Sequence, residues 1–297
     1  GGQAVMEGVM MRNADKYAVA VRKTDGEIVV KTEEYKGIVQ NKKIRSLPII
    51  RGVFSFIDSM VLGMSTLTYS ASFFMDEEEE EKDEKKESVM MGLTIACSVV
   101  MAVAIFMILP YFLSQLFRKF TDSTTLITLL EGAVRLVIFF GYILLISRMK
   151  DIQRVFMYHG AEHKCINCIE HGMELNVENV LKSSRLHKRC GTSFLFIVMI
   201  VSIIFFLFIR IESPIWRVVF RLLLIPVIAG VSFEFIRLAG KSENKLVIFL
   251  SKPGMMLQKL TTREPDASMA EVAIASVEAV FDWRAYLKEN FGWQEKV

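Results

Sequence analysis

The chain has 297 residues, of which 52% are hydrophobic, and its mean hydropathy is +0.37. This composition is typical of proteins in contact with lipid rather than of one or two soluble domains. The formal net charge of +3 is too small to indicate a nucleic-acid-binding protein. Three of the four cysteines, Cys165, Cys168 and Cys190, fall in one segment, which favours metal or redox chemistry over a secreted disulfide framework.

The N-terminal region, 1–50, predicts a small β element. Two runs of β-branched residues, 17–22 and 28–31, flank a turn that contains Asp25 and Gly26. This pattern is typical of a β-hairpin.

Two segments of different character follow the β element. In 51–75 the apolar residues recur at helical spacing with hydroxyl side chains between them, so the segment predicts an amphipathic helix that is interfacial or re-entrant. In 76–88 acidic residues predominate, which predicts a solvated linker because such a composition repels itself and buries nothing.

Four apolar segments are each long enough, at about 1.5 Å per residue, to cross or nearly cross roughly 30 Å of hydrocarbon. We therefore predict an all-α membrane bundle of about four transmembrane helices, one pair within 89–148 and the other within 191–240. The apolar segments themselves are 89–112, 126–146, 192–209 and 218–235.

Lysine and arginine are concentrated before the first predicted span, between the second and third, and after the fourth. Positive residues mark the cytoplasmic side, and an even number of spans keeps both termini there. The regions 1–50, 149–190 and 241–297 are therefore predicted to be cytoplasmic parts of a multi-pass protein of the cell membrane.

Charged residues inside predicted spans are costly and therefore informative. Glu131 and Arg135 are four residues apart and predict an ion pair along one helix face, which could orient the bundle or serve transport. Arg221 and Glu234 lie near the two ends of their span, where snorkelling to the interface accounts for them.

Two helices are predicted after the fourth span. The first, 244–260, is amphipathic and is expected to break at Pro253. The second, 268–290, has an N-terminal cap available at Asp266 or Ser268.

The 149–190 segment carries all four histidines of the chain. His159 and His163 are four residues apart, so on a helix both imidazoles project from one face and can share a metal ion. Glu162 completes the order H-x-x-E-H of the inverted zinc peptidases, in which the glutamate acts on a water at the metal. His187 and Cys190 follow, so the segment predicts a metal loop in which one of these two supplies a third ligand.

Other interpretations of the same residues remain open. One alternative is a closed structural zinc site with four ligands, Cys165, Cys168, His187 and Cys190, whose spacing matches such sites. A redox role for the C-x-x-C pair is a third interpretation, although no thioredoxin-like pattern surrounds it.

Several strings of the chain resemble the domain-of-unknown-function family 1385, which comprises bacterial multi-pass membrane proteins. The strings are 1–12, 158–164, 178–179, 190–194 and 261–265, so the resemblance runs over nearly the whole chain. It implies a metal-dependent enzyme without a settled substrate, with motif positions at His159, Glu162, His163, His187 and Cys190.

Two departures from the family pattern bear on the metal ligands. The family has proline where Lys188 stands here, and it does not require Cys165. The second departure favours the open site over the closed one. The glycine-flanked 1–12 string could line a pocket beside the metal or lead into a strand.

The sequence therefore predicts an integral membrane, metal-dependent enzyme, with zinc as the expected ion and a hydrolytic reaction at the cytoplasmic interface. Glu162 is the expected general base, and His159, His163, and His187 or Cys190 are the expected ligands. The lipid bilayer is the one expected partner, and the substrate is a lipid or a peptide. The alternative is a non-enzymatic membrane scaffold or transport component whose metal site is structural.

Overall fold

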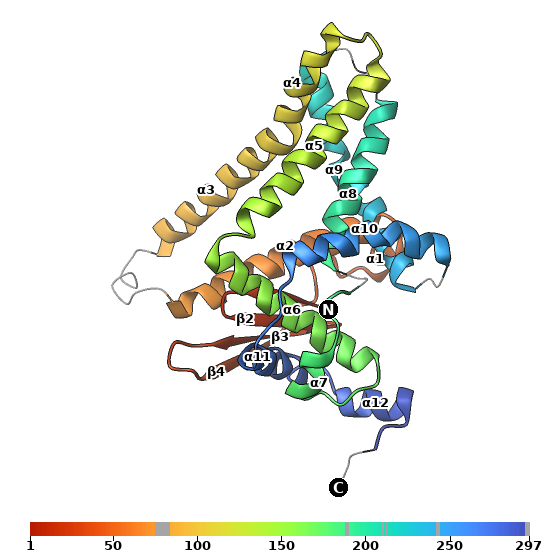
Figure 1. Ribbon diagram of the computed structural model, residues 1–297. Helices are drawn as coiled ribbons and strands as arrows, with labels where there is room; N and C mark the ends of the chain where they lie inside the picture. The colour runs from red at the N-terminus through yellow and green to blue at the C-terminus, as the bar shows by residue number, and fades with distance from the viewer. Residues whose placement is uncertain (75–83, 188–189, 210, 212, 242–243, 295–297) are drawn as a thin grey trace.

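A computed structural model of the chain describes residues 1–297 apart from 75–83, 188–189, 210, 212, 242–243 and 295–297. Long helices form an elongated bundle, and a four-stranded sheet with several shorter helices lies at one end of it (Figure 1). The strands are β1 (Gly2–Val5), β2 (Gly8–Asn13), β3 (Lys16–Arg22) and β4 (Ile28–Glu34).

Helices account for most of the described chain. The first part contains α1 (Lys42–Ser46), α2 (Ile50–Ala71), η1 (Ser72–Phe74), α3 (Glu84–Val103), the π-turn η3 (Ala104–Ile108), α4 (Leu109–Gln115), η4 (Leu116–Lys119) and α5 (Thr124–Ile146). The second part contains α6 (Lys150–Glu170), α7 (Val177–Lys182), α8 (Gly191–Phe208), α9 (Pro214–Lys241), α10 (Lys245–Thr261), α11 (Ala267–Glu278) and α12 (Trp283–Phe291).

The described residues contain five helices that are long and apolar enough to cross a membrane, one more than the sequence predicts. Four of them, Gly92–Lys119, Thr124–Ile146, Gly191–Phe208 and Ile215–Gly240, have mean hydropathies of 2.0 to 2.6 and match the predicted spans. They form the elongated bundle in Figure 1. The chain is thus a membrane protein with a helical bundle.

The fifth candidate, Ile50–Phe74, is less apolar, with a mean hydropathy of 1.2. Its main helix, α2, lies across the base of the bundle rather than along it (Figure 1). Gly52 of α2 meets Gly230 of α9, where an added Cβ would lie 2.9 Å from the Gly230 Cα. This contact, together with an ion pair between Arg51 and Glu234, fixes α2 against the bundle.

The N-terminal sheet is antiparallel in the order β1-β2-β3-β4, so the predicted hairpin is β3 and β4 and a second hairpin precedes it. Side chains alternate between its two faces. Val9 and Ala20 face a core shared with α6 and α11, whereas Met10 and Val19 face Leu62 of α2. The sheet is therefore packed between α2 and the α6 and α11 pair, and the 1–12 string forms two of its strands.

A buried ion network joins two helices of the bundle, α5 and α9, and we define it as Glu131, Arg135 and Arg221. Arg135 donates to Glu131 at 2.9 Å, as predicted, and Arg221 donates to the other carboxylate oxygen at 3.0 Å. Arg221 is 3% exposed, so the prediction that it snorkels is wrong. Glu234 is likewise held by Arg51.

Pro110 explains one further bond of the network. It has no backbone N–H, so the carbonyl of Phe106, four residues earlier, lacks its usual helical donor. Arg135 Nε donates to that carbonyl at 2.9 Å. The π-turn η3 and the helix α4 are thereby attached to α5.

The C-terminal helices differ from the prediction in two places. α10 continues through Pro253 instead of breaking there. The predicted 268–290 helix is two helices, α11 and α12, whose N-caps are Asp266 and Asp282. The predicted acidic linker falls mainly on 75–83, outside the described residues, and α3 begins at Glu84.

Candidate functional site

The predicted metal loop is largely helical. α6 runs without interruption from Lys150 to Glu170, so His159 and His163 project from one face of it, with ring centroids 4.4 Å apart. The sequence predicts a loop here because hydropathy separates spans from connections but does not distinguish a polar helix from a loop.

Gly160 lets α6 pass close to the linker between α10 and α11. A Cβ at this position would lie 2.0 Å from the carbonyl oxygen of Arg263, whose backbone N–H donates to Phe156 at 2.8 Å. Gly160 thus lowers the intrinsic helix propensity of α6 but permits close contact with the backbone of the linker.

His159, His163 and Cys190 come together, and we call them the His/Cys group. One potential ligand atom from each lies within 4.8 Å of the other two. Cys190 Sγ lies 3.3 Å from His159 Nε2. Cys190 precedes α8 and its sulfur accepts a hydrogen bond from the Thr192 backbone N–H, so the cap of α8 positions the thiol.

The second nitrogen of each imidazole is held by a backbone carbonyl. His159 Nδ1 lies 2.9 Å from the carbonyl oxygen of Thr261, and His163 Nδ1 lies 2.7 Å from that of Arg185. A carbonyl can only accept, so each Nδ1 carries the proton and donates. Both Nε2 atoms are then directed to the His/Cys group, the arrangement in which histidine binds a metal ion.

The His/Cys group has a charged form in the protein without an ion. Burial alone would raise the pKa of Cys190, but hydrogen bonds from His159 and His163 outweigh it and lower the pKa to about 5. Burial would lower the pKa of His159, but the Cys190 thiolate overcomes this effect and raises the pKa to about 9. The pKa of His163 is raised by the same partner. The group thus stabilises a thiolate on Cys190 beside the imidazolium of His159.

Glu162 stands beside the group and is tied to the N-terminal sheet. Its Oε1 accepts the backbone N–H of Gly2 at 3.0 Å, and its Oε2 lies 4.0 Å from His159 Nε2. A Cβ on Gly2 would lie 2.4 Å from the Met10 carbonyl oxygen and 3.1 Å from the Glu162 side chain. The 1–12 string therefore brings a backbone donor to Glu162.

A cavity of about 560 Å³, which we call the site cavity, opens onto these residues. One wall carries the His/Cys group and Glu162. The others come from the sheet and from the polar face of α2. They include Gly1, Gly2, Gln3, Arg12, Ser55, Asp58 and Ser59.

His187 and the C-x-x-C cysteines do not join the His/Cys group. His187 Nε2 lies 3.2 Å from a Glu170 oxygen, although the residue lines the same cavity. Cys165 and Cys168 are fully buried in the apolar core, on the face of α6 that packs against α11. The closed four-ligand site therefore does not assemble in the described part of the chain, and Lys188 lies outside that part.

Burial also makes the two core cysteines unsuited to redox chemistry. It raises the pKa of Cys165 well above its usual value and that of Cys168 to about 11, so both are thiols at neutral pH. The thiolate is the reactive form of cysteine.

Comparison with known proteins gives a family match and one relative. The family model described as "Protein of unknown function (DUF1385)" matches residues 47–283. A protein of Bacillus subtilis (strain 168) with the name "Uncharacterized protein YqhQ" is 36% identical over 301 residues, which cover 98% of this chain and 94% of the relative. No solved structure matches the chain.

Proposed function

The chain belongs to the family described as Protein of unknown function (DUF1385), and on that premise we propose that its His/Cys group binds a zinc ion and that the protein is a metal-dependent hydrolase. The observation that carries this proposal is the convergence of two imidazoles and a low-pKa thiol on the wall of a cavity that also contains a carboxylate.

The donors fit a divalent transition metal with a free coordination position. Two imidazole nitrogens and a thiolate form a ligand set found in catalytic zinc sites, where a fourth position stays open. The carbonyls of Thr261 and Arg185 fix both rings in the tautomer that this binding needs. A bound zinc ion would act as a Lewis acid and favour the ionisation of water at its open position.

Glu162 is the proposed general base. Its carboxylate lies next to His159 and faces the site cavity, so it can accept a proton from a water molecule that attacks the substrate. The bond from Gly2 holds one carboxylate oxygen and leaves the other directed toward the His/Cys group.

The proposed site of action is the cytoplasmic side of the cell membrane. Four spans form the bundle while α2 lies across it, so the sheet, α6 and α11 gather at one end (Figure 1). An even number of spans and the basic connections support the proposal that this end lies in the cytoplasm.

Metal analysis and activity of three variants of the purified full chain test the proposal. We expect about one zinc per chain in the wild type, because four-coordinate sites bind stoichiometrically. His163→Ala should lose the zinc, and Cys165→Ser, which alters a buried cysteine outside the group, should keep it. Glu162→Gln should keep the zinc and lose hydrolysis by about 10²- to 10⁴-fold.

The substrate probes are nitrophenyl esters and phosphodiesters presented in mixed micelles. A wild-type protein without stoichiometric transition metal would refute both the metal and the hydrolase proposals. A Glu162→Gln variant that hydrolyses every responsive probe at the wild-type rate would refute the role of this glutamate.

One observation favours the alternative of a scaffold with a structural metal site. Cys190 stands at the start of α8, whereas both histidines belong to α6, so an ion would clamp a bundle helix to the globular end. In that case chelation should lower the thermal stability of the protein, and Glu162→Gln should change neither the zinc content nor this stability. Hydrogen bonds of the buried ion network connect η3, α5, α8 and α9, which favours a bundle-orienting role over transport.

A further inference from the structure

After α7 the chain runs back toward α8 through residues 183–187, which we call the return segment. It belongs to no helix or strand, so its backbone carbonyls need donors from elsewhere. Side chains supply them: the carbonyl of every residue from Ser183 to His187 accepts a hydrogen bond from a side chain of α6 or α10. The path of the return segment is therefore set by these side chains rather than by a backbone ladder.

Asn167 is the central donor to the return segment. It lies four residues beyond His163 on α6, so the two side chains project from the same face of the helix. Its amide nitrogen donates to the carbonyls of Ser184 at 2.6 Å and Leu186 at 3.0 Å. A carbonyl can only accept, so both amide hydrogens are used. These two bonds flank the carbonyl of Arg185, which accepts from His163 Nδ1 at 2.7 Å.

Lys164 anchors the start of the return segment. Its ammonium group donates to the carbonyls of Leu181 and Ser183, each at 2.8 Å, and pairs with Glu264 at 2.9 Å. Lys164 and Asn167 are at most 5% exposed, so their bonds are shielded from water. Loss of either donor would leave buried carbonyls unpaired, which is costly.

The geometry points to Asn167 as a positioning residue of the His/Cys group. Its amide fixes the return segment so that the Arg185 carbonyl stays on His163 Nδ1, and His163 Nε2 stays directed toward the proposed zinc ion. The inference rests on the proposed function for the ion alone. The hydrogen bonds of Asn167 and His163 are properties of the metal-free protein.

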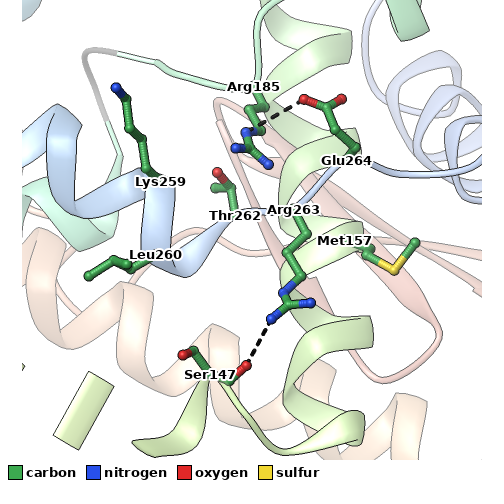
Figure 2. A pocket seen from close by; sticks show the side chains of 8 residues that line it. All are labelled: Ser147, Met157, Arg185, Lys259, Leu260, Thr262, Arg263 and Glu264. Carbon is green, nitrogen blue, oxygen red and sulfur yellow. Dashed lines mark hydrogen bonds and ion pairs between the residues drawn. The ribbon is translucent and has the colours of Figure 1, made fainter. Parts of the chain in front are cut away.

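The side chain of Arg185 takes no part in this arrangement. It lines a separate cavity of about 480 Å³, where its guanidinium lies 3.6 Å from a Glu264 oxygen (Figure 2). Both side chains are partly exposed, and such pairs contribute little to stability. Arg185→Ala removes this pair and keeps the backbone carbonyl, so it is a matched control for the loss of Asn167.

Zinc affinity of the purified full chain, measured by chelator competition, is the first test. Asn167→Ala should weaken zinc binding by about 10- to 100-fold, the usual effect of losing a group that orients a metal ligand. Arg185→Ala should bind zinc as the wild type does. So should Asn179→Ala, which removes an amide that donates to the Glu174 carbonyl at 2.9 Å, ahead of the return segment.

The imidazole proton on His163 Nδ1 gives a second measurement, which needs no zinc. The chain has four histidines, so isotope labelling of histidine nitrogen gives a simple NMR spectrum in which His163→Ala identifies the signal. In the metal-free wild type this proton should exchange slowly with water, because the Arg185 carbonyl accepts it. Asn167→Ala should speed the exchange by about tenfold or more, whereas Arg185→Ala should not change it.

Thermal unfolding shows whether each variant is folded, and Asn167→Ser, whose side chain is too short to reach both carbonyls, serves where Asn167→Ala is not. Wild-type exchange of the His163 proton in a folded Asn167 variant would overturn the inference, and so would wild-type zinc affinity there. An equal effect of Arg185→Ala would also overturn it. A wild type without zinc, in which Asn167→Ala still frees the His163 proton, would refute the metal proposal and leave the positioning role intact.

Discussion

Replacing Gly160 by alanine should disrupt the His/Cys group without altering any of its side chains. The new Cβ would lie 2.0 Å from the Arg263 carbonyl oxygen, against a practical minimum of 3.0 Å, so the linker must move by at least 1.0 Å. That movement breaks the 2.8 Å bond from Arg263 to Phe156 and pulls the Thr261 carbonyl away from His159 Nδ1. The second imidazole bond, from His163 to Arg185, stays in place.

The expected magnitudes follow from these contacts. Overpacking costs about 1–3 kcal/mol, and the lost backbone bond about 1 kcal/mol. Alanine returns about 1 kcal/mol of helix propensity, which leaves a net destabilisation of about 1–3 kcal/mol. Loss of the carbonyl that orients His159 should weaken zinc binding by about 10- to 100-fold.

Zinc affinity by chelator competition and thermal unfolding of the metal-free protein measure the two effects separately. Gly141→Ala is the matched control, because Gly141 lies inside α5 and an added Cβ there meets nothing within 4 Å. We expect this control to be neutral or slightly stabilising. Wild-type stability and zinc affinity in Gly160→Ala would refute the reasoning, since the structure leaves no room for the methyl group.

Three further outcomes are expected. The pKa of His159 is about 9, so the ring is protonated at pH 7 and zinc must displace its proton. Calorimetry in buffers of different ionisation enthalpy should therefore show proton release when zinc binds. The zinc affinity should rise by about tenfold per pH unit for each displaced proton, up to that pKa. In metal-free protein at pH 7, iodoacetamide should modify Cys190 before Cys165, because only Cys190 is a thiolate. Bound zinc should protect Cys190, and peptide mapping would measure both effects. Equal rates of modification at the two cysteines would contradict the assigned thiolate. Glu131→Gln should destabilise the bundle by about 3–5 kcal/mol, because two buried arginines lose their counter-ion. Unfolding in detergent would measure this free energy. Glu234 is more exposed, so Glu234→Gln should destabilise the protein less.

The parts of the fold that follow from local pattern could be predicted from the sequence. Hydropathy indicates the four bundle helices, and alternation around a turn indicates the β3 and β4 hairpin. The preceding hairpin was missed because its turn residue, Glu7, has a positive φ of 48° that its sequence does not suggest. Tertiary contacts likewise decide that α10 continues through Pro253.

The candidate site divides in the same way. Helical spacing places His159 and His163 together, because both lie on one turn of α6. Whether His187 or Cys190 approaches them depends on how the chain after α7 returns to α8, and the spacing does not determine that path. The structure brings Cys190 to the pair and directs His187 to Glu170. The burial of Arg221 could not be predicted for a similar reason, since its partner Glu131 belongs to another helix.

Cys190 is the N-cap of α8, so the His/Cys group is coupled directly to a helix of the membrane bundle. α8 has 18 residues, or about 27 Å at the usual rise, which is slightly short of roughly 30 Å of hydrocarbon. A span shorter than the hydrocarbon is accommodated by local thinning of the bilayer or by snorkelling of its flanking residues, at a modest cost in free energy. Cys190 caps α8 whereas the histidines lie on α6, so mismatch strain on α8 acts on the spacing between sulfur and imidazoles. Membranes of different thickness should therefore give the His/Cys group different geometries.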